Sequence, residues 1–203
     1  HLNADYKITS NLKIGTILNF NSSKQDRRNT SFWNIGKLLP FGSVYKEDGS
    51  LNLYPWPGSL DRNPLVDEDP LNYVNNTRTS RIFMVGFGEW NILKNLSFRT
   101  NFGVDIFNSQ QGIYEGTLYT LASLNNGMSH SSITDIKTRN MTWENTLNYK
   151  QSFGDHNVAL LAGTSTIKGS STVFSGEGKN QPFPTAEFYN LSANTLDIRT
   201  NSS

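Results

Sequence analysis

Residues 96–107 read LSFRTNFGVDIF, and this stretch decides the fold. Large apolar side chains recur at every second position, and the positions between them are polar, charged or glycine. Because a β-strand places successive side chains on opposite faces, this spacing predicts a strand with one apolar and one polar face. The apolar face would carry Leu96, Phe98, Thr100, Phe102, Val104 and Ile106, and the polar face Ser97, Arg99, Asn101, Gly103 and Asp105.

Similar patterns predict further strands on both sides of this one. Residues 12–20 and 141–149 also alternate, whereas 81–92 and 156–166 are rich in aromatic and β-branched residues with less distinct faces. Adding a strand at the start of the chain, the predicted strands lie near 1–8, 12–24, 79–92, 96–108, 138–150 and 156–174. No stretch shows the 3.6-residue apolar spacing and capping residues that indicate a helix. The chain is therefore predicted to be all-β and antiparallel.

The predicted connections alternate between short and long. Short turns are expected around 9–11, 92–95 and 150–155, and long loops at 25–78, 109–137 and 176–187. Loops longer than about 15 residues are uncommon inside a compact domain. Long strands with short turns at one end and long loops at the other are typical of a transmembrane β-barrel. We therefore expect a barrel segment, and a soluble β-sandwich is the alternative because its strands also alternate.

The composition fits a barrel wall and excludes several other classes. Only 35% of the 203 residues are hydrophobic, and the 25 Asn, 22 Ser and 18 Thr make up almost a third of the chain. No apolar run approaches the ~20 residues of a membrane helix, and no signal peptide is evident. A net charge of +1 argues against nucleic-acid binding, and the absence of Cys excludes disulfides and thiolate metal sites.

Each face of such a wall would have its own contacts. Lipid would contact the apolar side chains, and an aqueous lumen the polar ones. The residues expected to face lipid are Leu96, Phe98, Phe102, Val104, Ile106, Trp143 and Leu147. The residues expected to face the lumen are Arg99, Asn101, Asp105 and Glu144.

The long loops contain aromatic residues that could bind a ligand. Sugars and peptides stack on such side chains, so Tyr54, Trp56, Tyr73, Tyr114 and Tyr119 are candidate ligand-binding residues. The alternative is that they pack the loop on itself or on a covering protein.

Catalytic and metal-binding patterns are weak. The acidic run 67–69 could offer oxygens to Ca²⁺ but lacks EF-hand spacing, so a solvated loop is expected. The three histidines have no metal-ligand spacing, and no nucleophile-elbow, P-loop or zinc-protease motif occurs. We therefore predict no enzyme activity, no cofactor and no metal site.

Four stretches resemble one family. They are RIFMVGFGEWNILKNLSFRTNFGVD at 81–105, WENTLNYKQSFGDHNVALLAG at 143–163, DYKITSNLKIG at 5–15, and YKEDGS at 45–50 followed by Asn63-Pro64-Leu65. In order and spacing they resemble the barrel of the SusC/RagA family of TonB-dependent outer-membrane transporters.

The resemblance implies an outer-membrane nutrient importer. It implies a barrel of about 22 strands around a plug, a SusD-like surface lipoprotein as a lid, and import of oligosaccharides or peptides. TonB would be contacted through an N-terminal region that is not in these residues. The chain is accordingly expected to be an internal piece that ends in a loop at 201–203, with its open strand edges paired to the remainder of the barrel. The alternatives are a secreted β-sandwich that binds carbohydrate through Trp56, and an outer-membrane adhesion barrel without transport.

Overall fold

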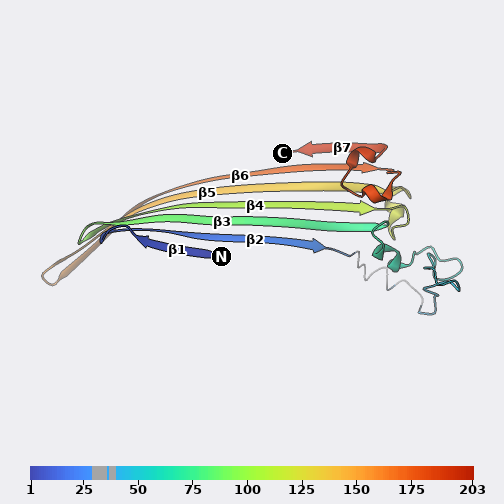
Figure 1. The fold of residues 1–203 in the computed structure, drawn as a ribbon, viewed down its shortest axis with the longest axis horizontal. Coiled ribbons are helices and arrows are strands. Elements are labelled where there is room, and N and C mark those ends of the chain that lie inside the picture. The colour runs from blue at the N-terminus through green and yellow to red at the C-terminus, as the bar shows by residue number, and fades with distance from the viewer. Residues whose placement is uncertain (29–35, 37–39) are drawn as a thin grey trace. The chain divides into compact units, whose positions relative to one another are not determined.

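The computed structural model describes residues 1–28, 36 and 40–203. Within them, seven strands form one antiparallel sheet in chain order (Figure 1). The strands are β1 (Leu2–Lys7), β2 (Leu12–Asp26), β3 (Tyr73–Leu93), β4 (Leu96–Glu115), β5 (His130–Phe153), β6 (His156–Lys179) and β7 (Leu196–Ser202). This single sheet confirms the all-β, antiparallel prediction and is at odds with a β-sandwich, which needs a second sheet.

The loops contain short helical turns. In residues 40–203 they are the 3-10 helices η1 (Pro64–Glu68), η2 (Ala122–Asn125), η3 (Pro184–Ala186) and η4 (Leu191–Ala193). Across the described part of the chain, no helix is both long enough and apolar enough to cross a membrane.

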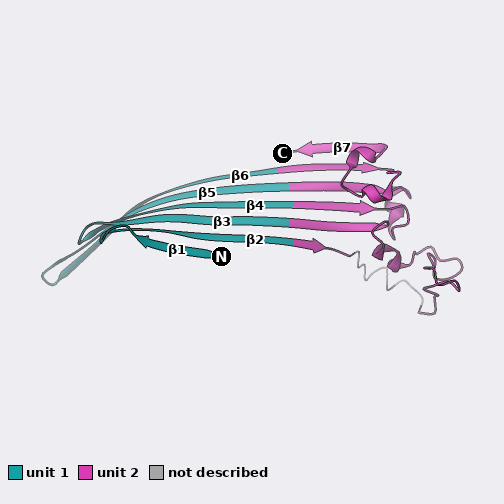
Figure 2. Ribbon diagram, viewed as in Figure 1, with its two compact units in different colours: residues 1–23, 79–109, 136–172 teal, residues 24–78, 110–135, 173–203 magenta. Residues whose placement is uncertain are grey.

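The chain divides into two compact units, described separately here (Figure 2). Unit 1 comprises residues 1–23, 79–109 and 136–172, and contains the short turns at 8–11, 94–95 and 154–155. Unit 2 comprises residues 24–78, 110–135 and 173–203, and contains the longer connections at 27–72, 116–129 and 180–195.

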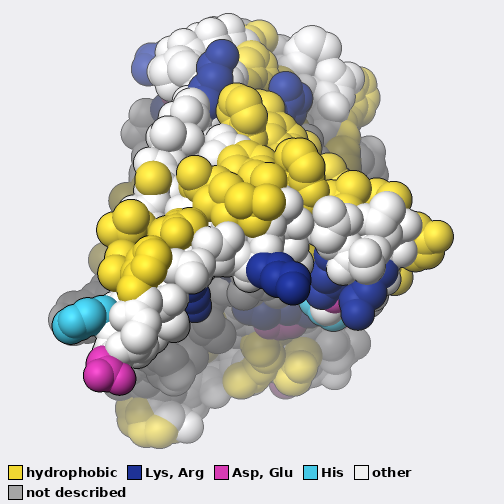
Figure 3. All heavy atoms as spheres, turned by 90° about the vertical axis from the view of Figure 1, so that its left-hand side faces the viewer, with side chains coloured by type: hydrophobic (Ala, Val, Ile, Leu, Met, Phe, Trp, Pro, Cys, Tyr) yellow, Lys and Arg dark blue, Asp and Glu magenta, His cyan; other side chains and the backbone are white. Residues whose placement is uncertain are grey.

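Unit 1 is a sheet without a core. The structure describes all of its residues, and none of them is buried. Its predicted apolar face remains open: Phe102, Trp143 and Leu147 are 43%, 53% and 40% exposed. Figure 3, which faces the end of unit 1 that holds the short turns, shows a broad patch of hydrophobic side chains. Because exposed apolar surface of this extent is unfavourable in water, unit 1 needs a nonaqueous neighbour or another layer.

Unit 2, in contrast, has a small core. Its buried apolar residues are Val66, Tyr114, Tyr119, Ala122 and Phe188. Three glycines of β4 and β6 make room for the connection 180–195. A side chain at Gly112 would overlap the Phe188 ring, one at Gly176 would meet Leu191, and one at Gly178 would meet Asn194.

The strands extend further into the predicted loops than the sequence indicated. β3 begins at Tyr73, β4 continues to Glu115, β5 begins at His130 and β6 continues to Lys179. The first two predicted loops, 25–78 and 109–137, are correspondingly shorter, at 27–72 and 116–129, whereas the third begins and ends later than predicted, at 180–195 instead of 176–187. Residues 29–35 and 37–39 of the first lie outside the described residues. The expected loop at 201–203 is corrected too, because residues 196–202 form β7, whose Glu177↔Arg199 pairing with β6 provides backbone hydrogen bonds.

Candidate functional site

The polar face of unit 1 is organised by ion pairs. Arg81 of β3 donates two hydrogen bonds to Asp105 of β4, at 2.9 and 2.7 Å. Arg99 lies 3.5 Å from the Glu89 carboxylate and donates a 3.1 Å hydrogen bond to Asn101. Of the lumen-facing candidates, Arg99 thus pairs with an acidic residue of β3, and Asp105 pairs with a basic residue of β3.

A phenylalanine also lies on this polar face. The Phe87 ring is packed over Gly15, where a side chain would collide with it. The Arg99 guanidinium is 4.8 Å from the ring centroid and the Lys13 ammonium 5.5 Å, distances at which cations are attracted to an aromatic ring. Lys13 also forms a 2.8 Å ion pair with Asp5. The ring therefore packs between charged groups rather than in an apolar core.

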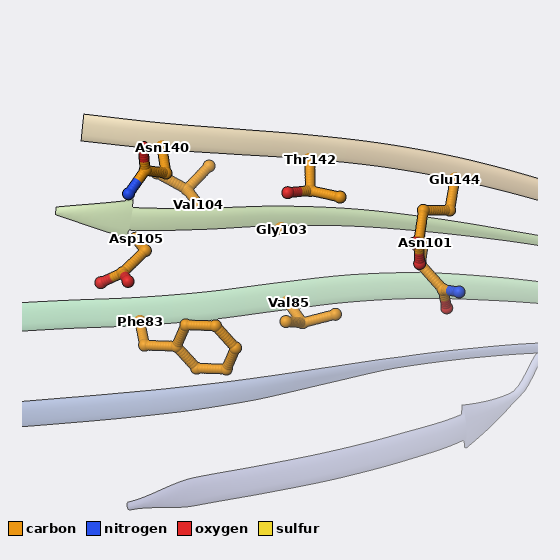
Figure 4. A pocket seen from close by; sticks show the side chains of 9 residues that line it. All are labelled: Phe83, Val85, Asn101, Gly103, Val104, Asp105, Asn140, Thr142 and Glu144. Atoms are coloured by element: carbon orange, nitrogen blue, oxygen red, sulfur yellow. The ribbon is translucent and has the colours of Figure 1, made fainter. Parts of the chain in front are cut away.

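Beside these pairs lies a shallow cavity of about 310 Å³ (Figure 4). The predicted lumen-facing residues Asn101, Asp105 and Glu144 all line it, together with Asn140 and Thr142 of β5. Phe83 and Val85 of β3 add an apolar edge. Carboxylate, amide and hydroxyl groups next to apolar carbon can hydrogen bond to polar solutes such as sugars or peptides.

The lipid-facing candidates lie on the opposite face of the same strands by alternation, except that Val104 is also among the residues that line the cavity. Trp143 donates a 3.0 Å hydrogen bond to Thr100, which places the odd positions of β5 beside the even positions of β4. By strand alternation, the candidates Leu96, Phe98, Phe102, Val104, Ile106, Trp143 and Leu147 then share one face. Their contact with lipid remains a prediction.

Unit 2 contains a histidine between two glutamates that the sequence did not single out. His130 Nδ1 lies 3.2 Å from Glu115, and its Nε2 lies 3.7 Å from Glu177. Asn125 in η2 donates a 2.8 Å hydrogen bond to the same Glu115 carboxylate. Because Glu115 ends β4 and His130 begins β5, the pair joins the two ends of the connection 116–129.

The surroundings shift the pKa values of this cluster. The hydrogen bond to Glu115 raises the pKa of His130, and the negative charges outweigh the opposing effect of burial. Burial by itself would raise the pKa of Glu115, but hydrogen bonds from His130 and Asn125 bring it below its ordinary value. Burial, with the Glu115 charge, also raises the pKa of Tyr119. Both shifts of the pair favour a charged His130–Glu115 pair.

This pair predicts a pH-dependent connection 116–129. Because the pKa of His130 is raised, its protonated ring stabilises the folded connection fully below about pH 6.5. This stabilisation is lost as pH rises through the pKa of His130 in the folded protein. Because the pKa of Glu115 is lowered, its carboxylate stabilises the folded connection above about pH 4.5. This stabilisation is lost as pH falls through the pKa of Glu115 in the folded protein. After correction for intrinsic rates, hydrogen exchange of residues 116–129 should be about fivefold slower at pH 5.5 than at pH 8.5. His130→Gln should abolish the difference, and an unchanged pH dependence in that variant would refute the role of the pair.

A second polar groove, of about 480 Å³, lies in unit 2. Glu177 of β6 is paired in register with Arg199 of β7, so the groove has one acid and one base side by side. Its other polar lining residues are Ser132, Thr134, Ser175, Thr200 and Asn201. The groove therefore offers hydrogen-bond donors and acceptors, together with one negative and one positive side chain.

The predicted aromatic residues do not gather into one site. Tyr114 and Tyr119 are buried, at 1% and 5% exposure, and Tyr119 stacks on Tyr73 with ring centroids 5.1 Å apart. These three fit the alternative that loop aromatics pack within the protein. Tyr54 is 43% exposed and Trp56 is half-buried in the connection 27–72. A ligand-binding role remains a prediction for all five, and Tyr54 and Trp56 are the more accessible.

Glu68 and Asp69 of the acidic run 67–69 are exposed, as expected of a solvated loop, whereas Asp67 is not. Asp67 is buried and accepts a 2.9 Å hydrogen bond from the Thr120 amide. Glu68 pairs with Arg28 at 3.0 Å, and Asp69 accepts from the Leu71 amide at 2.9 Å. Among the described residues, no group of three or more His, Cys, Asp or Glu side chains is arranged to hold a metal ion. The acidic run thus joins the connection 27–72 to Thr120 and Arg28.

Sequence comparison shows similarity between the chain and TonB-dependent receptors. It is 26% identical over 195 residues to TonB-dependent receptor P26 of Formosa agariphila, covering 94% of this chain and 19% of that protein. It is 29% identical over 175 residues to TonB-dependent receptor P3 of the same organism, covering 82% of this chain and 17% of that protein. The chain thus spans less than a fifth of the length of these curated relatives. No protein-family model matches it.

Solved structures share the fold. The RagAB peptide importer in the closed-closed state aligns with a TM-score of 0.69 at 17% identity, covering 98% of this chain and 23% of that chain. A structure of the RagAB peptide transporter aligns with a TM-score of 0.67 at 18% identity, covering 98% and 24%. The chain is therefore similar in sequence to TonB-dependent receptors and has the fold of part of the RagAB structures, in agreement with its resemblance to the SusC/RagA family.

Proposed function

We propose that this chain forms part of the wall of an outer-membrane, TonB-dependent importer that takes up oligosaccharides or peptides. The observation that carries the proposal is a coreless sheet with one apolar face and one ion-paired face, in a relative of TonB-dependent receptors. In this arrangement lipid covers the apolar face, and the polar face lines the solute pathway. The remaining wall, the plug and the region that contacts TonB belong to the rest of the protein.

The polar face of each unit fits a polar solute. In unit 1, Asn101, Asp105 and Glu144 line a cavity open to solvent. In unit 2, Glu177 and Arg199 lie in a hydroxyl-rich groove that suits the charged termini of a peptide as well as sugar hydroxyls. The RagAB structures are of a peptide importer. The experiment below therefore compares peptides with oligosaccharides.

A SusD-like surface lipoprotein is the proposed partner at the loop end. The connection 27–72 exposes large apolar side chains: Leu60 is 95% exposed and Phe41 79% exposed. These two exposed side chains are the residues that we propose for the contact with the lipoprotein.

The test is energy-dependent uptake by cells that carry the full-length protein. Fluorescent peptide and oligosaccharide mixtures are supplied to wild-type cells, to cells lacking the gene, and to cells lacking TonB. We expect uptake of one of the two substrate classes to require both the gene and TonB. Uptake of both classes without the gene, or without TonB, would contradict the proposal. Surface attachment without uptake would favour an adhesion barrel.

A further inference from the structure

Unit 1 carries a cluster of three basic residues on its apolar face. β5 contributes Lys137 and Arg139, and β6 contributes Lys168. The register of these strands is constant: Ser152 bonds to Asn157, Asn145 to Thr164, and Thr138 to Ser171. No residue is therefore inserted in this part of either strand, and alternation holds over the whole stretch.

Alternation places the three cations together. Lys137 and Arg139 share a face with Asn145 and Trp143, which bond to the even positions of β6 and β4. The same register sets Lys168 opposite Met141, so Arg139 and Lys168 are diagonal neighbours, with Cβ atoms about 7 Å apart. Lys137 lies two residues from Arg139, also about 7 Å away along the strand.

These cations have one acidic neighbour on their face, Asp135 of β5, which lies two residues from Lys137. In unit 1, which the structure describes completely, every Asp or Glu within a strand lies at a position that alternation assigns to the polar face. All three basic residues are exposed, and none takes part in an ion pair of the described residues. The next acidic residue of β5 on this face, Asp135, accepts a hydrogen bond from Gln110. Three cations therefore face a single acid, and the cluster has a net positive charge.

The position of the cluster identifies what could neutralise it. A transmembrane strand crosses the hydrocarbon layer with about 9–11 residues. Counted back from Phe153 at the short turn, 11 residues end at Trp143, and Arg139 lies four residues beyond. The cations thus follow the apolar stretch at the loop end of β5. In an outer membrane this is the level of the outer-leaflet headgroups.

We propose that Lys137, Arg139 and Lys168 bind the phosphate groups of the anionic glycolipid in the outer leaflet. Arginine and lysine side chains bind phosphate through charge-assisted hydrogen bonds, and three converging cations match its multiple negative charges. The apolar surface next to the cluster would contact the acyl chains of the same lipid. This inference rests on the proposed outer-membrane location.

The test measures lipid retention by the full-length protein in phosphatidylcholine nanodiscs containing lipid A. The variant K137Q/R139Q/K168Q removes the cluster, and K7Q/K94Q/K150Q removes three charges from the short-turn end as a matched control. Because each basic residue near an anionic surface contributes about fivefold, the cluster variant should bind lipid A about a hundredfold more weakly. The control should match the wild type, and dephosphorylated lipid A should bind wild type and cluster variant equally weakly.

Several outcomes separate the possibilities. Less than a threefold difference between wild type and cluster variant for lipid A overturns the inference. Equal retention of lipid A and dephosphorylated lipid A also overturns it, since the phosphates would then contribute nothing. Displacement of lipid A by millimolar inorganic phosphate would show that a free phosphate site, rather than a lipid site, is present. Failure of the wild type to insert into nanodiscs would instead refute the proposed function.

Discussion

Replacing Phe102 with arginine should lower the free energy of unfolding of the membrane-embedded protein by about 2–4 kcal/mol. Phe102 lies on the apolar face near the middle of the first half of β4, where the proposed barrel wall crosses the hydrocarbon layer. A guanidinium at the centre of a bilayer loses its hydration without gaining a partner. Denaturant unfolding of the full-length protein in lipid vesicles, followed by tryptophan fluorescence, gives the value.

Asn101→Arg is the matched control for this substitution. Asn101 is the preceding residue of the same strand and lines the polar cavity of unit 1. An added cation there faces Asp105 and Glu144, so the free energy of unfolding should change by less than about 1 kcal/mol. Equal destabilisation by both substitutions would mean that the two faces of β4 do not differ in their surroundings.

Replacing Gly112 with alanine should release the connection 180–195 from the sheet. The Cβ atom would overlap the ring of Phe188, which is 4% exposed in the core of unit 2. Overpacking of this kind costs about 1–3 kcal/mol. Chymotryptic cleavage at the aromatic residues of 180–195 should therefore become about five to a hundred times faster in Gly112→Ala.

Gly86→Ala is the matched control for Gly112→Ala. Gly86 also lies within a long strand, but no atom lies within 4 Å of where its Cβ would be. Cleavage in 180–195 should be unchanged in this variant. If Gly112→Ala also leaves cleavage unchanged, the packing of Phe188 against β4 is not what holds the connection.

Strands could be predicted from the sequence where the two faces of the sheet have different surroundings. Residues 96–107 alternate because one face of unit 1 is apolar and the other carries ion pairs such as Arg81–Asp105. The loop-end halves of the strands give no such pattern. In β4, Asn108 and Gln110 bond on one face and Gln111 bonds on the other, so polar residues lie on both sides. Strand ends in those halves could not be predicted from periodicity.

The candidate site was predictable in part for the same reason. Alternation grouped Asn101 and Asp105 on one face of β4, and both line the cavity in the structure. It could not identify the cross-strand partners Arg81 of Asp105 and Glu89 of Arg99, because the sequence leaves the register of the neighbouring strand open. The His130–Glu115 contact could have been anticipated, since both residues flank one connection between adjacent strands. The packing of Phe188 against Gly112 could not be predicted, because it depends on tertiary contacts alone.

In the proposed barrel wall, the alternating faces of unit 1 contact lipid on one side and water on the other. The most direct test is a nitroxide scan of residues 96–107 in the full-length protein in vesicles, aided by the absence of Cys from this chain. For labels at the even positions from Leu96 to Ile106, collision with oxygen, which concentrates in lipid, should dominate. For labels at the odd positions, collision with a water-soluble nickel complex should dominate. A profile without this two-residue period, or water-accessible labels at the even positions, would contradict a transmembrane barrel wall.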